Sequence, residues 1–183
     1  AGAVALLYLL LRRRATPATA LLLSLLYAFG TTSLVVSSQA LWAHGLAQFL
    51  IIATMLLVTG PRTAVRVAAA GLFCAMIAAN RQADAILAAP LALYGLWWAG
   101  PHRLLLVAAG LVPVGLSLAY NLLVVGHVAG AYALFVRPHN YNDDILGGIA
   151  GLLASPVRGL FVFSPFLLFV PCLFLLALRD RAM

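Results

Sequence analysis

Apolar residues fill the chain in long runs, and short polar segments separate the runs. The apolar runs cover residues 1–11, 18–36, 46–59, 67–99, 104–125 and 159–178. A helix needs about 20 residues to cross the hydrocarbon core of a bilayer, and most of these runs approach or exceed that length. They are too continuous for the alternating strands of a transmembrane barrel. The pattern therefore predicts an all-α bundle of transmembrane helices.

The run at 67–99 contains one polar interruption, Asn80-Arg81-Gln82-Ala-Asp84. A single helix over this run would be about 50 Å long, against a hydrocarbon core of about 30 Å. It would also place the interruption in the middle of the membrane, where charges are costly. Two shorter helices that meet at the interruption avoid this cost. We therefore expect about seven membrane segments in one transmembrane domain over residues 1–183, with a large polar loop at 126–158.

The first run, 1–11, is too short to cross a membrane alone, and Arg12–Arg14 follow it. A signal peptide fits poorly, because its charges would precede the apolar residues. We expect this run to be the end of a helix, in a fragment that lacks at least one upstream segment. Pro17 suits the first turn of the next helix, which the pattern extends over 18–36 as one crossing.

The second half of the chain is predicted to contain three further helices. A crossing over 104–125 would be kinked at Pro113, and a short interfacial helix is expected at 147–153. The last crossing, over 159–178, contains two prolines that would interrupt it, Pro165 and Pro171.

Composition agrees with this pattern. The chain is 65% hydrophobic and 8% charged, with a mean hydropathy of +1.10, whereas a soluble domain is about a quarter charged. The net charge of +7 would suggest nucleic acid as a partner of a soluble protein. Here the arginines lie at the ends of apolar runs, where they act as topology signals. We therefore expect membrane lipids as partners and no nucleic acid.

The arginines also predict an orientation. Cytoplasmic loops carry an excess of basic residues. With two crossings in 67–99, the arginines expected on the cytoplasmic side are Arg12–Arg14, Arg62, Arg66, Arg103, Arg179 and Arg181. Only Arg81, Arg137 and Arg158 fall on the other side. The prediction is a multi-pass protein of the inner (plasma) membrane, with the polar loop extracytoplasmic and the C-terminus cytoplasmic.

Two arginines on the predicted extracytoplasmic side are candidate anion ligands. Arg81 and Asp84 are three residues apart, so they can form a structural ion pair on a helical turn. Alternatively, Arg81 binds an anionic head group, because a guanidinium presents a planar fork of donors that suits phosphate. Arg158 has the same phosphate-binding interpretation, or it extends to lipid phosphates from a helix end.

The remaining polar residues on this side have two interpretations each. His44, close to Trp42, is either a hydrogen-bonded residue of an aromatic belt or a group that contacts substrate or transfers protons. Asp143 and Asp144, with His139, either bind a divalent cation or act as a base, or they belong to a solvated loop. Cys74 and Cys172 lie inside apolar runs, so neither a disulfide nor a cysteine metal site is expected.

The order of the polar breaks resembles bacterial polytopic glycosyltransferases of the GT-C class, related to the protein O-mannosyltransferase and aminoarabinose-transferase families. The segments that carry the resemblance are Leu41-Trp-Ala-His44-Gly45, Asn80-Arg81-Gln82-Ala-Asp84, Tyr120-Asn121 with Gly126, and Ser155-Pro-Val-Arg158-Gly-Leu-Phe-Val-Phe-Ser164-Pro165. The last of these is the most similar to the family pattern. Gln82-Ala83 departs from it, because a Pro-Thr or similar pair is expected there.

The resemblance implies an inverting transfer of sugar from a polyprenyl-phosphate donor to an acceptor on the extracytoplasmic face. It implies Arg81 and Arg158 as ligands of the donor phosphate, and it implies that the main acidic base lies upstream of this fragment. Weak catalytic candidates within the fragment are His44, Asp143 and Asp144, the two aspartates contacting the acceptor or a divalent cation. Trp42, Asn121 and His139 would line the cavity.

Two other functions remain open at this point. A transporter or flippase of a lipid-linked or anionic substrate would also place charges beside cavities, and it would show paired hydropathy repeats. No such repeat is evident in the sequence. A structural membrane subunit would use every arginine as an anchor. The sequence leaves the sugar, the acceptor and the oligomeric state open.

Overall fold

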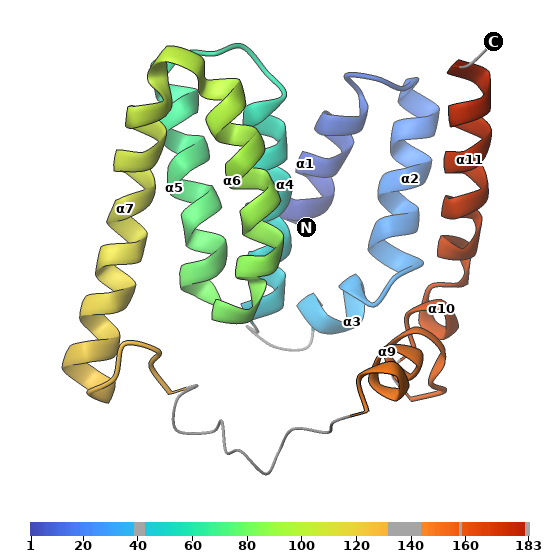
Figure 1. The fold of residues 1–183 in the computed structure, drawn as a ribbon. Coiled ribbons are helices and arrows are strands. Elements are labelled where there is room, and N and C mark those ends of the chain that lie inside the picture. The colour runs from blue at the N-terminus through green and yellow to red at the C-terminus, as the bar shows by residue number, and fades with distance from the viewer. Residues whose placement is uncertain (39–42, 132–143, 158, 182–183) are drawn as a thin grey trace.

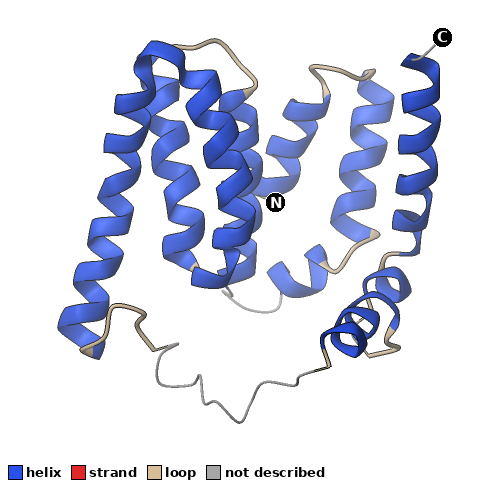
Figure 2. Cartoon of the chain, in the orientation of Figure 1, coloured by secondary structure: helices blue, strands red, loops and turns tan. Residues whose placement is uncertain are grey.

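The structure is a computed structural model that describes residues 1–38, 43–131, 144–157 and 159–181. All regular elements in these residues are helical, and no strand occurs among them (Figure 2). The prediction of an all-α fold is confirmed. The helices are α1 (Gly2–Leu11), α2 (Pro17–Phe29), α3 (Ser33–Ser38), α4 (Ala43–Val58), α5 (Ala64–Asn80), η1 (Gln82–Asp84), α6 (Ala85–Ala99), η2 (Gly100–His102), α7 (Arg103–Tyr120), η3 (Asn121–Val125), α9 (Ile145–Ala154), α10 (Leu160–Phe163), η5 (Pro165–Leu168) and α11 (Phe169–Arg181).

The longer helices run up and down between two ends of the molecule (Figure 1). At one end, which we call the arginine end, lie the turns from α1 to α2, from α4 to α5 and from α6 to α7, together with the end of α11. At the other, the polar end, lie α3, η1, η3 and α9. The predicted cytoplasmic and extracytoplasmic segments of the described chain therefore separate to opposite ends of the bundle.

The run at 67–99 forms two helices, as predicted. Helix α5 ends at Asn80, and Arg81 is extended, with φ −152° and ψ 117°. The short turn η1 then leads into α6, which runs back toward the arginine end (Figure 1). The polar interruption therefore lies at the polar end of the molecule and not in the middle of a helix.

The prediction of one helix over 18–36 is wrong. Helix α2 begins at Pro17, as expected, but it ends at Phe29. The Thr31 hydroxyl donates a hydrogen bond to the Tyr27 carbonyl at 2.6 Å, and the Ser33 amide donates to the Thr31 hydroxyl at 3.0 Å. Such local side-chain bonds offer the backbone an alternative to the helix. The chain therefore turns at Gly30–Thr32, and α3 is a separate helix.

The C-terminal part agrees with the pattern in outline. Helix α9 covers the helix expected at 147–153 and extends it to Ile145–Ala154. The last apolar run is interrupted at Pro165, as expected, because α10 ends at Phe163 and η5 precedes α11. Pro171 lies in the first turn of α11, where a proline is tolerated, so the second interruption does not occur. The crossing expected over 104–125 is helix α7 up to Tyr120, with Pro113 inside it, followed by the π-helical turn η3.

Helix α5 lies at the centre of the packed part and contacts α4, α6 and α7. It approaches α7 closely at Gly71, where a Cβ would overlap the Leu106 carbonyl oxygen. Gly110 of α7 approaches the Gly71 carbonyl in turn, since a Cβ there would be 3.2 Å from that oxygen. Small residues let two helix backbones come this close. The core beside this contact contains Val67, Ala70, Trp98, Ala99 and Leu106.

Large apolar side chains are exposed on the outward faces of the helices. Examples are Leu22 of α2, Ile86 and Trp97 of α6, and Leu104 of α7, each more than 65% exposed. Among the described residues, one helical stretch, Gln82–Val125, is long and apolar enough to cross a membrane by length and composition, and it contains the turn between α6 and α7. The apolar helices α1, α2, α4, α5 and α9 are shorter, at 10–17 residues.

Candidate functional site

The described part of the polar end contains one arginine, Arg81, and it joins two elements. Its Nη1 atom is 3.1 Å from Nδ1 of His44, in the first turn of α4, and 3.7 Å from Oδ1 of Asp84 in η1. The neighbouring Asn80 donates a hydrogen bond from its side chain to the Ala43 carbonyl at 2.9 Å. The start of α4 and the end of α5 are therefore fixed to each other through the residues that flank Arg81.

The contact between Arg81 and His44 has a defined direction. A guanidinium has only donors, so Nδ1 of His44 accepts the hydrogen bond from Arg81. His44 therefore helps to hold the Arg81 guanidinium in place.

Asp84 and Arg81 are exposed to different degrees. The side chain of Asp84 is 12% exposed and that of Arg81 is 34% exposed. Oδ2 of Asp84 is buried and has no hydrogen-bond partner among the described groups. The carboxylate thus lies behind the guanidinium, and the guanidinium faces the accessible side. The structural ion pair and an anion-binding role for Arg81 are compatible, because the pair uses only part of the arginine's five donors.

A cavity of about 260 Å³ lies beside Arg81. Its lining includes Asn121 and Tyr120 from the end of α7, and Gly130 from the following turn. The Asn121 side chain donates a hydrogen bond to the Val128 carbonyl at 3.1 Å, which holds that turn against the helix end. The structure therefore brings Asn121, expected to line a cavity, to the same cavity as Arg81.

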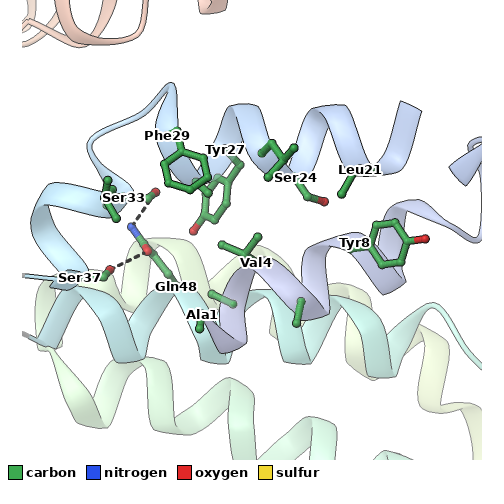
Figure 3. Close-up of a pocket in the computed structure, with 15 residues that line it drawn as sticks. Ala1, Val4, Tyr8, Leu21, Ser24, Tyr27, Phe29, Ser33, Ser37 and Gln48 are labelled. Carbon is green, nitrogen blue, oxygen red and sulfur yellow. Dashed lines mark hydrogen bonds between the residues drawn. The ribbon is translucent and has the colours of Figure 1, made fainter. Parts of the chain in front are cut away.

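A second cavity, of about 680 Å³, lies between α1 and α2, and we call it the apolar slot (Figure 3). Its walls are formed by apolar side chains such as Val4, Leu21 and Phe29. Where the slot meets α3, the Gln48 side chain donates a hydrogen bond to the Ser33 hydroxyl and accepts one from the Ser37 hydroxyl, both at 3.3 Å. Gln48 is one helical turn after His44 on α4, so the slot and the Arg81 site share one face of that helix.

This polar group at the slot was not predicted. Gln48 stands four residues after His44 inside an apolar run, and Ser33 and Ser37 are four residues apart in the run before it. Polar residues at helical spacing in two neighbouring apolar runs were the available signal. Their contact also depends on the separate helix α3, which the sequence did not reveal.

Asp144 has a structural role in this arrangement. It is the N-cap of α9, and its Oδ1 accepts a hydrogen bond from the Gly147 amide at 2.7 Å. The other candidates Trp42, His139, Asp143 and Arg158 lie outside the described residues. Within the described chain, no three His, Cys, Asp or Glu side chains lie close enough together to hold a metal ion.

Asp144→Ala is expected to destabilise α9 by about 1 kcal/mol, because it removes the capping acceptor. Asp144→Asn keeps that acceptor and should leave the helix unchanged. Hydrogen exchange of the amides in Ile145–Ala154 measures both effects. If both variants keep the same exchange rates as the unchanged protein, the cap does not stabilise the helix.

The chain matches no known protein-family model, and no curated protein or solved structure shows significant similarity to it.

Proposed function

We propose that the chain is a polytopic membrane protein whose helices form about seven membrane segments. Support comes from the exposed apolar faces of α2, α6 and α7, which in water would leave large hydrophobic patches uncovered. The separation of the arginine-bearing turns from the polar breaks also supports it, because basic residues gather on the cytoplasmic side. On this proposal the polar end is extracytoplasmic, and the C-terminus is cytoplasmic, in the inner membrane.

We propose further that the polar end belongs to a glycosyltransferase that moves a sugar from a polyprenyl-phosphate donor to an acceptor. The observation that supports this best is the arrangement at Arg81, a partly exposed guanidinium held between His44 and a buried carboxylate and facing a cavity. A fixed cation can stabilise the phosphate that departs from the sugar. Because the arginine is positioned before substrate arrives, little reorganisation is needed.

Each residue of the site has a distinct role in this proposal. Arg81 binds the donor phosphate, and Arg158 remains a second candidate ligand from the sequence. Asp84 acts on Arg81 as a positioning residue. His44 fixes the guanidinium through Nδ1. None of these groups is assigned as the general base.

The apolar slot suits the isoprenoid part of such a donor. Its volume of about 680 Å³ and its apolar walls fit a hydrocarbon chain. Gln48, Ser33 and Ser37 line the slot where it meets α3. A lipid with its phosphate at Arg81 would need an apolar path that begins near His44. The position of Gln48 one turn along α4 places the slot beside that point.

The test is sugar transfer in proteoliposomes that contain the intact protein and radiolabelled polyprenyl-phosphate sugars. Transfer to an acceptor by the unchanged protein supports the proposal. If none of the donors supports transfer, while the same vesicles show flux of a lipid-linked or anionic substrate, the protein is a transporter. The interrupted C-terminal helix pair α10 and α11 is a feature that transporters share.

A further inference from the structure

The arginine end contains a second group of cations that the proposed function does not use. Arg13 lies in the turn after α1, and Arg66 lies in the first turn of α5. Arg13 Nη1 and Arg66 Nη2 each donate a hydrogen bond of 2.9 Å to the same acceptor, the Leu56 carbonyl near the end of α4. Arg13 Nη1 also donates to the Thr59 hydroxyl at 2.7 Å. The two guanidinium groups therefore share one acceptor and lie close to each other.

The backbone around this pair holds Arg66 in place. A Cβ on Gly60 would overlap the Arg66 guanidinium, so the guanidinium lies directly against this glycine. The Gly60 carbonyl accepts a hydrogen bond from the indole of Trp98 at 3.2 Å, and Trp98 is only 5% exposed in the core. The buried Trp98 side chain therefore holds the turn between α4 and α5, where Arg66 and its acceptor meet.

The pair has an excess of positive charge. Asp84 and Asp144 belong to the polar end, and Asp180 lies in the last turn of α11, an element with no described contact to α1 or α5. One carbonyl oxygen carries only a partial charge, so it does not neutralise two guanidinium groups that repel each other. Nε of Arg66 is also buried without a hydrogen-bond partner among the described groups, and a buried unpaired donor in a native protein calls for an explanation.

We propose that Arg13 and Arg66 bind a phosphate group at the arginine end, from either a phospholipid headgroup or free phosphate. Two planar guanidinium forks match the several oxygens of a phosphate, and together they balance its charge. Arg66 lies at the N-terminal end of α5, where the helix dipole also favours an anion. This site lies at the opposite end from Arg81, and it does not depend on sugar transfer.

The experiment uses the intact protein in nanodiscs of phosphatidylcholine, with or without phosphatidylglycerol, and in phosphatidylcholine with added inorganic phosphate. Thermal unfolding reports binding, because a ligand of the folded state raises the melting temperature. We expect phosphatidylglycerol or phosphate to raise it. Arg13→Gln and Arg66→Gln should weaken the apparent affinity by about tenfold or more, since each removes a charge-assisted contact.

Arg14→Gln is the matched control. Arg14 is exposed in the same turn and makes no side-chain hydrogen bond in the described chain, and the variant removes the same charge. Arg14→Gln should keep the full rise in melting temperature. A shift with phosphatidylglycerol alone identifies the headgroup as the source, and a shift with inorganic phosphate identifies free phosphate.

Two results would overturn the proposal. One is a melting temperature that rises neither with phosphatidylglycerol nor with inorganic phosphate. The other is an equal loss in Arg14→Gln and Arg13→Gln, which would indicate a general charge effect. Arg13 is exposed, so Arg13→Gln provides the answer even if Arg66→Gln fails to fold.

Discussion

On the proposed function, Arg81→Gln is expected to reduce sugar transfer by about 100-fold or more, because removal of one preorganised charge-stabilising donor has effects of that size. Glutamine keeps a polar side chain of moderate length, so the hydrogen bond to His44 can be partly replaced while the charge is lost. The measurement is the rate of transfer from the labelled polyprenyl-phosphate sugar in proteoliposomes. Saturation with donor would show whether binding or turnover is affected.

Arg81→Lys tests the geometry at constant charge. An ammonium group cannot form the planar fork, so transfer should be intermediate between those of Arg81→Gln and the unchanged protein. Arg103→Gln is the control for net charge, since Arg103 is exposed at the arginine end and donates only to the nearby Gly100 carbonyl among the described groups. A folded Arg81→Gln that transfers sugar at the normal rate would reduce Arg81 to a structural ion-pair partner of Asp84.

The break at Asn80–Asp84 could be predicted because its cause is visible in the sequence. An arginine and an aspartate inside a long apolar run are costly unless the chain brings them to an end of the bundle. The break at Gly30 was missed for the opposite reason. The bonds among Tyr27, Thr31 and Ser33 are local and uncharged, and each of these residues is tolerated in a helix.

The contacts at the two charged sites show a similar division. The topology predicted from the sequence assigned His44 and Arg81 to the same extracytoplasmic side, although they are 37 residues apart. It did not indicate that they touch, because contact depends on how α4 packs on α5. The meeting of Arg13 and Arg66 was not predictable, because their acceptor is the Leu56 carbonyl, and a backbone acceptor carries no sequence signal.

Gly71→Ala is expected to destabilise the protein by about 2–3 kcal/mol, as overpacking of a closely packed core does. The added methyl group would overlap the Leu106 carbonyl oxygen and lie 2.8 Å from its carbon. These are backbone atoms, so no side-chain rotation relieves the contact, and α5 and α7 must separate. The melting temperature of the protein in detergent should fall by roughly 5–10 °C.

Gly115→Ala supplies the matched control, because it makes the same chemical change in helix α7, where a Cβ meets nothing within 4 Å. Alanine is favoured over glycine in a helix by up to about 1 kcal/mol, so this variant should be neutral or slightly more stable. The two substitutions therefore have opposite expected signs although their effect on helix propensity is the same. Equal melting temperatures for both variants would mean that α5 and α7 are not in close contact at Gly71. A loss confined to Gly71→Ala would show that the backbones of α5 and α7 are closely packed at this position.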